Sequence, residues 1–127
     1  MRDPELAAEI LKQIQTTGIT ILARFKPITS VEDFTGSDAG KEKLDAICMQ
    51  LISLGESLKK LDAVTDQSLL SRYPQIEWKK AMGLRDIITH HYFDLNAEAI
   101  FDVCRTKIEP LIVAIETMLN DLQKKWP

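Results

Sequence analysis

The sequence lacks the features that mark membrane-spanning and secreted proteins. No apolar run among its 127 residues approaches the ~20 residues that cross a bilayer. The first residues, Met1-Arg2-Asp3-Pro4-Glu5, contain no apolar segment of the kind found in signal peptides. We therefore expect a cytoplasmic protein that makes no membrane contact.

Cysteine and histidine are scarce, with two residues of each. Cys48 and Cys104 both fall on apolar helical stripes, which predicts buried free thiols rather than a disulfide. His90 and His91 are adjacent, and adjacent side chains on a helix point about 100° apart, so they rarely bind one ion together. Neither cysteine has metal-site spacing, and only two aspartates lie close enough in sequence to add ligands. We expect neither a metal site nor a cofactor.

Several other patterns are missing. No stretch alternates apolar and polar residues with period two, no internal repeat occurs, and no glycine-rich phosphate loop is present. No serine or cysteine lies beside the histidines, which argues against a nucleophile triad. Lysine and arginine number 16 against 19 acidic residues, a net charge of −3. This balance argues against a protein that coats nucleic acid, so any RNA contact requires a local basic patch.

Helical periodicity is what the sequence does contain. Apolar residues make up 45% of the chain and recur at three- and four-residue steps in four stretches. These predict helices from Pro4 to about Arg24, from Lys41 to about Leu61, from Pro74 to about His90, and from Ala97 to about Leu122. We predict an all-α, four- or five-helix up-and-down bundle that forms a single domain over residues 1–127.

Prolines and polar clusters mark the boundaries of these helices. Asp3-Pro4-Glu5 has a capping side chain, a proline at the first helical position and an acid in the first turn. Residues 28–40 and 62–74 are rich in turn-forming side chains and predict loops, the first of them held to the bundle by Val31 and Phe34. Pro110 should kink or divide the last helix, because it removes a backbone donor and crowds the preceding turn.

Two positions within the predicted helices, Gly18 and the pair Gly55-Glu56, have two interpretations each. Gly18 is compatible with a close helix crossing or with a tolerated weak point that costs roughly 1 kcal/mol relative to alanine. Gly55 removes a side chain where another backbone could approach, and Glu56 would then lie beside that contact. The alternative for Glu56 is an ordinary exposed position on a helix.

The stretch from Trp78 to Tyr92 carries the chemistry. Arg85 is a permanent cation, and an unperturbed histidine titrates near ~6.5, so Arg85 and His90 combine a fixed charge with a proton carrier. On an ideal helix Arg85 and Tyr92 share a face, whereas Arg85 and His90 diverge by about 140°. A long arginine side chain, a frayed helix end or a second copy of the chain could bring Arg85 and His90 together.

The pattern Arg-x4-His-x-Tyr resembles the signature of the HEPN superfamily, and specifically of HepT-like toxins. The similarity extends from about Ile28 to Leu119. It includes Ser30-Val31-Glu32-Asp33-Phe34, Leu54-Gly55-Glu56-Ser57, Tyr73-Pro74-Gln75-Ile76-Glu77-Trp78 and Gly83-Leu84-Arg85-Asp86. The family more often has asparagine at the position of Asp86. If the asparagine amide orients the catalytic side chains in the family, their detailed geometry would differ in this chain.

The resemblance implies a HEPN-like helical bundle that acts as an endoribonuclease toxin, paired with a nucleotidyltransferase antitoxin of the MntA type. It also implies a two-fold homodimer in which two Arg/His motifs form one composite site. In that site His90 would transfer protons and Arg85 would stabilise the phosphorane, without a metal ion. Tyr92 matches the tyrosine to which the antitoxin adds AMP, a modification that inhibits the toxin.

Further residues are weaker candidates. Lys79, Lys80, Asp86 and His91 are candidates for substrate contacts, and Gly55 and Glu56 for dimer contacts. A second interpretation of the chain is a non-catalytic helical module that docks a nucleotidyltransferase or a nucleotide and uses Arg85 and His90 only for phosphate contacts. Histidines near helix ends are often simple capping or surface groups. The intact motif favours the enzyme, whereas the acidic surface mildly favours the module.

Overall fold

Helices and their connections account for all residues of the computed structural model that can be described, which are 3–90 and 95–125, and no strand occurs among them. The helices are α1 (Pro4–Phe25), α2 (Glu32–Thr35), α3 (Asp38–Val64), the 3₁₀ helix η1 (Leu70–Arg72), α4 (Trp78–Met82), α5 (Leu84–His90), α6 (Ala97–Thr106) and α7 (Ile108–Lys125). The all-helical bundle expected from the sequence is confirmed.

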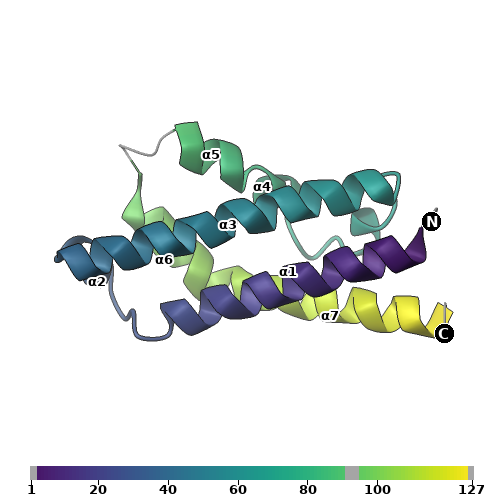
Figure 1. Cartoon of the computed structure of the whole chain (residues 1–127), viewed down its shortest axis with the longest axis horizontal. Coiled ribbons are helices and arrows are strands. Elements are labelled where there is room, and N and C mark those ends of the chain that lie inside the picture. The colour runs from purple at the N-terminus through teal and green to yellow at the C-terminus, as the bar shows by residue number, and fades with distance from the viewer. Residues whose placement is uncertain (1–2, 91–94, 126–127) are drawn as a thin grey trace.

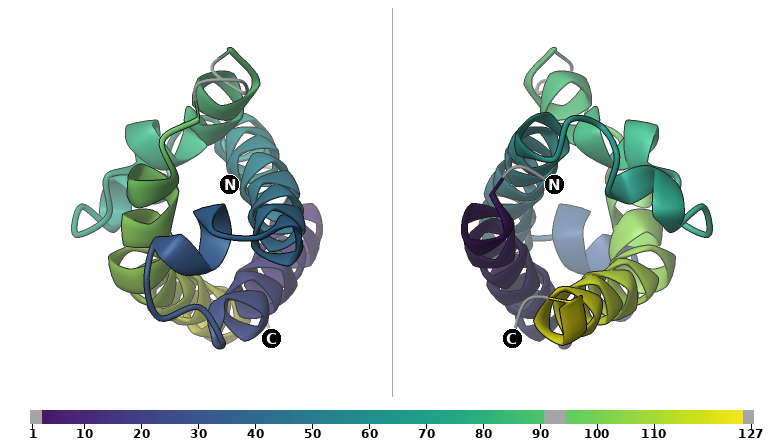
Figure 2. Two further views of the ribbon diagram at one scale, coloured as in Figure 1. Left: turned by 90° about the vertical axis from the view of Figure 1, so that its left-hand side faces the viewer. Right: turned by 90° about the vertical axis from the view of Figure 1, so that its right-hand side faces the viewer.

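Three long helices, α1, α3 and α7, form the body of the bundle, with α1 packed against both of the others (Figure 1). The chain runs along α1, returns along α3, reverses through α4 and α5, and returns again through α6 and α7 (Figure 1). Viewed end-on, these segments surround a common axis and α2 lies across one end (Figure 2). Apolar side chains from every long helix fill the interior, as the buried Ile14, Leu51 and Ile115 illustrate.

Helix α1 begins and ends as the sequence predicts. The Asp3 side chain accepts a hydrogen bond from the Leu6 backbone N–H at 3.0 Å, which satisfies one free donor of the first turn. The helix ends at Phe25, two residues before Pro27. A Cβ atom at Gly18 would lie 2.7 Å from Cγ1 of Ile112 on α7. Gly18 therefore marks a close helix crossing, the first of its two interpretations.

The predicted third helix is wrong in its start and in its continuity. It begins at Trp78 rather than near Pro74, and it is divided into α4 and α5 at Gly83. The Gly83 N–H is shared between the carbonyl oxygens of Lys79 and Lys80, at 3.1 and 3.2 Å, which tightens the last turn of α4. The segment before it contains η1, and the Trp78 indole donates to the carbonyl of Tyr73 at 2.8 Å.

Pro110 divides the last predicted helix. Helix α6 ends at Thr106 and α7 begins at Ile108, so Pro110 occupies the first turn of α7. A proline there would clash with the carbonyl four residues earlier, that of Thr106, if the helix ran on unbroken. At the other end of α6, Asn96 caps the helix by accepting from the Ala99 N–H at 3.2 Å.

The predicted loop before α3 contains more structure than expected. Helix α2 forms within it, and α3 begins at Asp38 instead of Lys41. Phe34 is fully buried, as predicted, and its ring lies 6.5 Å from that of Phe101 on α6. These aromatic contacts close the end of the bundle that α2 covers.

Both cysteines are free and buried, as predicted. Burial raises the pKa of the Cys48 thiol to about 11 and the pKa of the Cys104 thiol to about 12. None of the helices in the described part of the chain has both the length and the apolar character that a bilayer crossing needs.

Candidate active site

Helix α5 carries Arg85 and His90 and lies along α3 on the outside of the bundle (Figure 1). Ile88 is buried, with 2% of its surface exposed, and anchors this short helix. The other side chains of its second half, Thr89 and His90, are exposed. The fold therefore presents Arg85 and His90 on the surface.

Gly55 of α3 fixes the position of α4 and α5. A Cβ atom at Gly55 would lie 3.1 Å from the carbonyl oxygen of Ala81, 3.4 Å from that of Met82 and 3.6 Å from the backbone nitrogen of Arg85. The close backbone approach expected at this glycine thus occurs within one chain, and Glu56 lies beside it. A role for Gly55 and Glu56 in a dimer contact remains a prediction.

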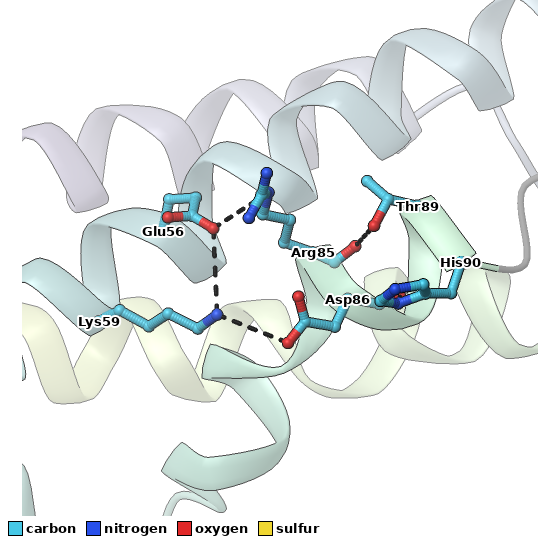
Figure 3. Close-up of polar contacts among 6 residues, drawn as sticks. All are labelled: Glu56, Lys59, Arg85, Asp86, Thr89 and His90. Atoms are coloured by element: carbon cyan, nitrogen blue, oxygen red, sulfur yellow. Dashed lines mark hydrogen bonds and ion pairs between the residues drawn. The ribbon is translucent and has the colours of Figure 1, made fainter.

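Four charged side chains form a network across α3 and α5 (Figure 3). Nε of Arg85 lies 3.3 Å from Oε1 of Glu56. Nζ of Lys59 lies 4.0 Å from the same Glu56 oxygen and 3.7 Å from Oδ2 of Asp86. The carboxylate of Glu56 is therefore shared by two cations, and Lys59 is shared by two carboxylates.

This network is exposed and balanced in charge. The side chains of Arg85, Glu56, Lys59 and Asp86 are 52%, 46%, 40% and 57% exposed. Exposed ion pairs are typically worth about 0.2–1 kcal/mol, so an incoming anion can displace them. The two cations and two carboxylates sum to zero, and a proton on His90 would add one positive charge.

His90 has a defined tautomer. Its Nδ1 lies 2.8 Å from the backbone carbonyl oxygen of Asp86, and a carbonyl only accepts, so Nδ1 carries the proton. In the neutral ring Nε2 then holds the free lone pair, on an exposed side chain. This nitrogen can take a proton from a substrate, and the protonated ring can return one.

Arg85 and His90 are not brought together within one chain. The Arg85 guanidinium extends toward Glu56 on α3, whereas the His90 ring lies beside the Asp86 backbone (Figure 3). No hydrogen bond joins the two side chains in the part of the chain that the structure describes. This is the divergence that the helical geometry predicts.

Of the candidates for substrate contacts that the structure describes, only Asp86 joins the charge network. Asp86 belongs to the charge network, through Lys59. Lys80 pairs with Glu77 at 3.0 Å, and that hydrogen bond lowers the pKa of the Glu77 carboxyl. Lys79 is exposed on α4. His91 and Tyr92 lie outside the described residues.

Lys59 is the residue of this charge network that sequence reasoning missed. It lies three residues after Glu56 on the same helix, a spacing that joins side chains on one face. Its contact with Asp86 depends on how α5 sits against α3, which the sequence alone does not give. Among the described residues, no three histidine, cysteine or acidic side chains cluster as a metal site.

An apolar pocket of about 280 Å³ lies elsewhere, between α4 and the junction of α6 with α7. Ile76, Ala81, Leu84, Val103 and Leu111 line it, and neither Arg85 nor His90 does. Arg85 and His90 thus lie on the exposed surface and not in this pocket.

Comparison with known proteins identifies the family of the chain. A family model described as "Ribonuclease HepT-like" matches residues 6–118. The chain belongs to the ribonuclease HepT-like family. The match includes all of α3 and α5, the helix that carries Arg85 and His90, and most of α1 and α7.

Two archaeal relatives are similar to this member of the HepT-like family. The protein named "Putative RNase MJ0127" from Methanocaldococcus jannaschii is 31% identical over 115 residues, which cover 88% of this chain and 92% of the relative. "Putative RNase MJ0125" from the same organism is 27% identical over 78 residues, which cover 61% of this chain and 62% of the relative. No solved structure matches the chain.

Proposed function

We propose that the chain is a metal-independent endoribonuclease whose site is formed by Arg85 and His90. The single observation that carries this proposal is the exposed His90, with Nδ1 bonded to the Asp86 carbonyl and Nε2 available for proton transfer, in a member of the HepT-like family. Arg85 lies five residues earlier on the same short helix and supplies the permanent positive charge that an anionic phosphate needs.

The reaction is an intramolecular attack within RNA. Nε2 of a neutral His90 takes the proton of a ribose 2′-hydroxyl, and the 2′-oxygen bonds to the adjacent phosphorus. The bond from phosphorus to the 5′-oxygen then breaks, and that oxygen receives a proton from a protonated histidine. The products are a 2′,3′-cyclic phosphate and a 5′-hydroxyl. DNA has no 2′-hydroxyl and should not be cut.

Arg85 stabilises the negative charge that grows on the phosphorane. A planar guanidinium can donate two parallel hydrogen bonds to two phosphate oxygens, which an ammonium cannot match. For this contact Arg85 must release Glu56, which holds it in the unbound protein. The half-exposed setting of that pair makes the exchange inexpensive.

A two-fold homodimer would bring the diverging side chains together. Arg85 of one chain and His90 of the other could then face one phosphate, and the two histidines could serve as base and acid. Closed two-fold dimers are the commonest soluble oligomers, and α5 lies on the outside of the bundle, where a second copy can reach it.

The biological role we propose is that of a toxin controlled by a nucleotidyltransferase antitoxin of the MntA type. The antitoxin would transfer AMP from ATP to the Tyr92 oxygen and release pyrophosphate. The attached phosphate would place an anion near Arg85, where substrate phosphate must bind, and so inhibit cleavage. This proposal rests on the family and on the sequence pattern Arg85-x4-His90-x-Tyr92.

Cleavage assays on purified protein test the proposed activity. In the presence of a chelator the protein should cut single-stranded RNA and leave the DNA analogue intact. His90→Ala should lower the rate by about 10²–10⁴-fold, and Arg85→Ala by a comparable factor, whereas His91→Ala should cost less. Cleavage that chelation abolishes and Mg²⁺ restores would contradict the mechanism.

A non-catalytic binding module is the second candidate. The observation that favours it is the neutral charge network, in which both cations already have carboxylate partners. Such a module would bind RNA or a nucleotide without cutting it. Binding that depends on Arg85, with no cleavage by the wild-type protein under any condition, would support this function over the first.

A further inference from the structure

Glu56 is the carboxylate that pairs with Arg85 in the unbound protein. Its Oε1 lies 3.3 Å from Nε of Arg85, and a carboxylate presents two oxygens to a guanidinium much as a phosphate does. The same oxygen lies 4.0 Å from Nζ of Lys59, beyond the 2.7–2.9 Å of a strong charge-assisted hydrogen bond. The distance between Nζ of Lys59 and Oε1 of Glu56 can therefore shorten by about 1 Å.

We propose that Glu56 is an internal competitor for phosphate at Arg85, and that Lys59 takes over its carboxylate when phosphate binds. This inference rests on the proposed function in one respect, the use of Arg85 as a phosphate ligand. Glu56 and Lys59 are positioning residues that act through Arg85. The exchange sets how readily the site accepts an anion.

The exchange requires only side-chain movement. At Gly55 the backbone of α3 lies close to the Ala81 carbonyl and the Arg85 backbone nitrogen, which places α5 beside Glu56. Glu56 and Lys59 lie three residues apart on one face of α3, and each is about half exposed. Rotation of exposed side chains is fast and makes the carboxylate free to pass from Arg85 to Lys59.

Lys59 is suited to receive the carboxylate because of its second partner. It now lies between Glu56 and Asp86, at 4.0 and 3.7 Å, and is tightly bound to neither (Figure 3). When phosphate takes Arg85, Glu56 would otherwise be an unpaired carboxylate beside a bound anion. Pairing of the Glu56 carboxylate with Nζ of Lys59 offsets its repulsion by the bound phosphate.

Binding of a ligand that cannot be cleaved tests the proposal. The probe is a 2′-O-methyl oligoribonucleotide, which has phosphates but no free 2′-hydroxyl. Glu56→Gln should bind it about two- to fivefold more tightly, the factor that loss of a weak exposed pair corresponds to. Lys59→Gln should bind it more weakly by a similar factor. The double variant should bind as tightly as Glu56→Gln alone, because Lys59 then has no Glu56 carboxylate to remove from Arg85.

Two matched variants separate this effect from net charge. Glu42→Gln removes an exposed acid from the same helix, and Lys60→Gln removes an exposed lysine next to Lys59. Neither side chain forms an ion pair with any residue that the structure describes. Each should change the affinity less than its counterpart in the network does.

A spectroscopic signal reports on Arg85 directly. The Nε–Hε resonance of Arg85, identified by its loss in Arg85→Ala, should shift when Glu56 is changed to Gln in the unbound protein. Inorganic phosphate added to the wild-type protein should move the same resonance away from its Glu56-bound position. The phosphate concentration at half of this shift should be lower in Glu56→Gln than in the wild-type protein, a difference that a purely structural role for Glu56 would not produce.

Three results would overturn the inference. They are a Glu56→Gln affinity no tighter than that of Glu42→Gln, an Arg85 signal insensitive to Glu56, and a Lys59→Gln loss equal in both backgrounds, which would make Lys59 a direct phosphate ligand. If any of these appeared while cleavage that depends on His90 persisted, the inference would fail and the proposed function would stand. Tighter binding by Glu56→Gln without cleavage by any variant would support the inference and contradict the ribonuclease.

Discussion

Gly55 and Ala81 meet so closely that a Cβ atom on the first would lie 3.1 Å from the carbonyl oxygen of the second. This contact joins α3 to α4 and places the backbone nitrogen of Arg85 within reach of the same helix. The position of α5 on the bundle thus depends on the absence of a side chain at Gly55. The geometry of Arg85, Glu56 and Lys59 follows from it.

Alanine at Gly55 should not give the stability that it gives elsewhere in a helix. Gly→Ala in a helix interior normally adds about 1 kcal/mol, but at Gly55 the Ala81 carbonyl must move to admit the methyl group. We expect a neutral or destabilising effect on the free energy of unfolding, measured in urea. Gly83→Ala is the control, because its nearest neighbour is at 3.4 Å and its φ of −84° suits alanine. A full gain at Gly55 would contradict the close contact.

Tyr73 should make the fold sensitive to alkaline pH. Burial, together with the hydrogen bond that its hydroxyl donates to Asp121 at 2.5 Å, raises the pKa of Tyr73 to about 12. A raised pKa means that the fold favours the neutral phenol. This stabilisation is present below the unfolded pKa of about 10 and is lost as pH rises through about 12.

Comparison with Tyr73→Phe measures this contribution. The variant should unfold about 1 kcal/mol more easily near neutral pH, because it lacks the hydrogen bond, and the difference from wild type should shrink between about pH 10 and 12. Asp121→Asn keeps a hydrogen-bond acceptor and serves as the control for charge. A difference that stays constant across this range would show that the phenol does not titrate as described.

Local sequence predicts the helices of this fold and several of their boundaries. The capped start of α1, the end of that helix before Pro27 and the division of the last helix near Pro110 all follow from side-chain and proline chemistry. The break at Gly83 was missed, because apolar spacing continues across it. It arises from hydrogen bonds to Lys79 and Lys80 that tighten the end of α4.

The sequence predicts Arg85 and His90 as a candidate site but does not predict the charge network around them. Their candidacy rests on their spacing and on the family resemblance, and their divergence follows from helix geometry. Lys59 and Glu56 come from another helix, so their contacts with Arg85 and Asp86 depend on how α5 rests on Gly55. Such long-range contacts leave no periodic signal in the sequence.

Modification of Tyr92 should be visible as a change in mass. Co-expression with a cognate nucleotidyltransferase should add one or more AMP groups to the chain, and Tyr92→Phe should block the gain. The Phe variant should keep its ribonuclease activity when the partner is present, because Arg85 then has no attached phosphate to bind. A mass gain that persists in Tyr92→Phe would place the modification on another residue.

Mixed dimers should reveal whether two chains share one site. Arg85→Ala and His90→Ala are each expected to be nearly inactive alone. Co-expressed with different affinity tags and purified as heterodimers, they should regain activity well above either homodimer, because one Arg85 and one His90 would face the same phosphate. Light scattering should give the mass of two chains. A mass of one chain with cleavage intact would contradict the shared site.

The chemistry of the cut ends tests the central claim most directly. RNA digested by the wild-type protein in a chelator should carry 5′-hydroxyl ends, which a polynucleotide kinase can label without prior phosphatase treatment. The matching fragments should end in a 2′,3′-cyclic phosphate, and His90→Ala should produce neither. Fragments with 5′-phosphate ends, or cleavage that requires added Mg²⁺, would contradict catalysis by Arg85 and His90 through the 2′-hydroxyl.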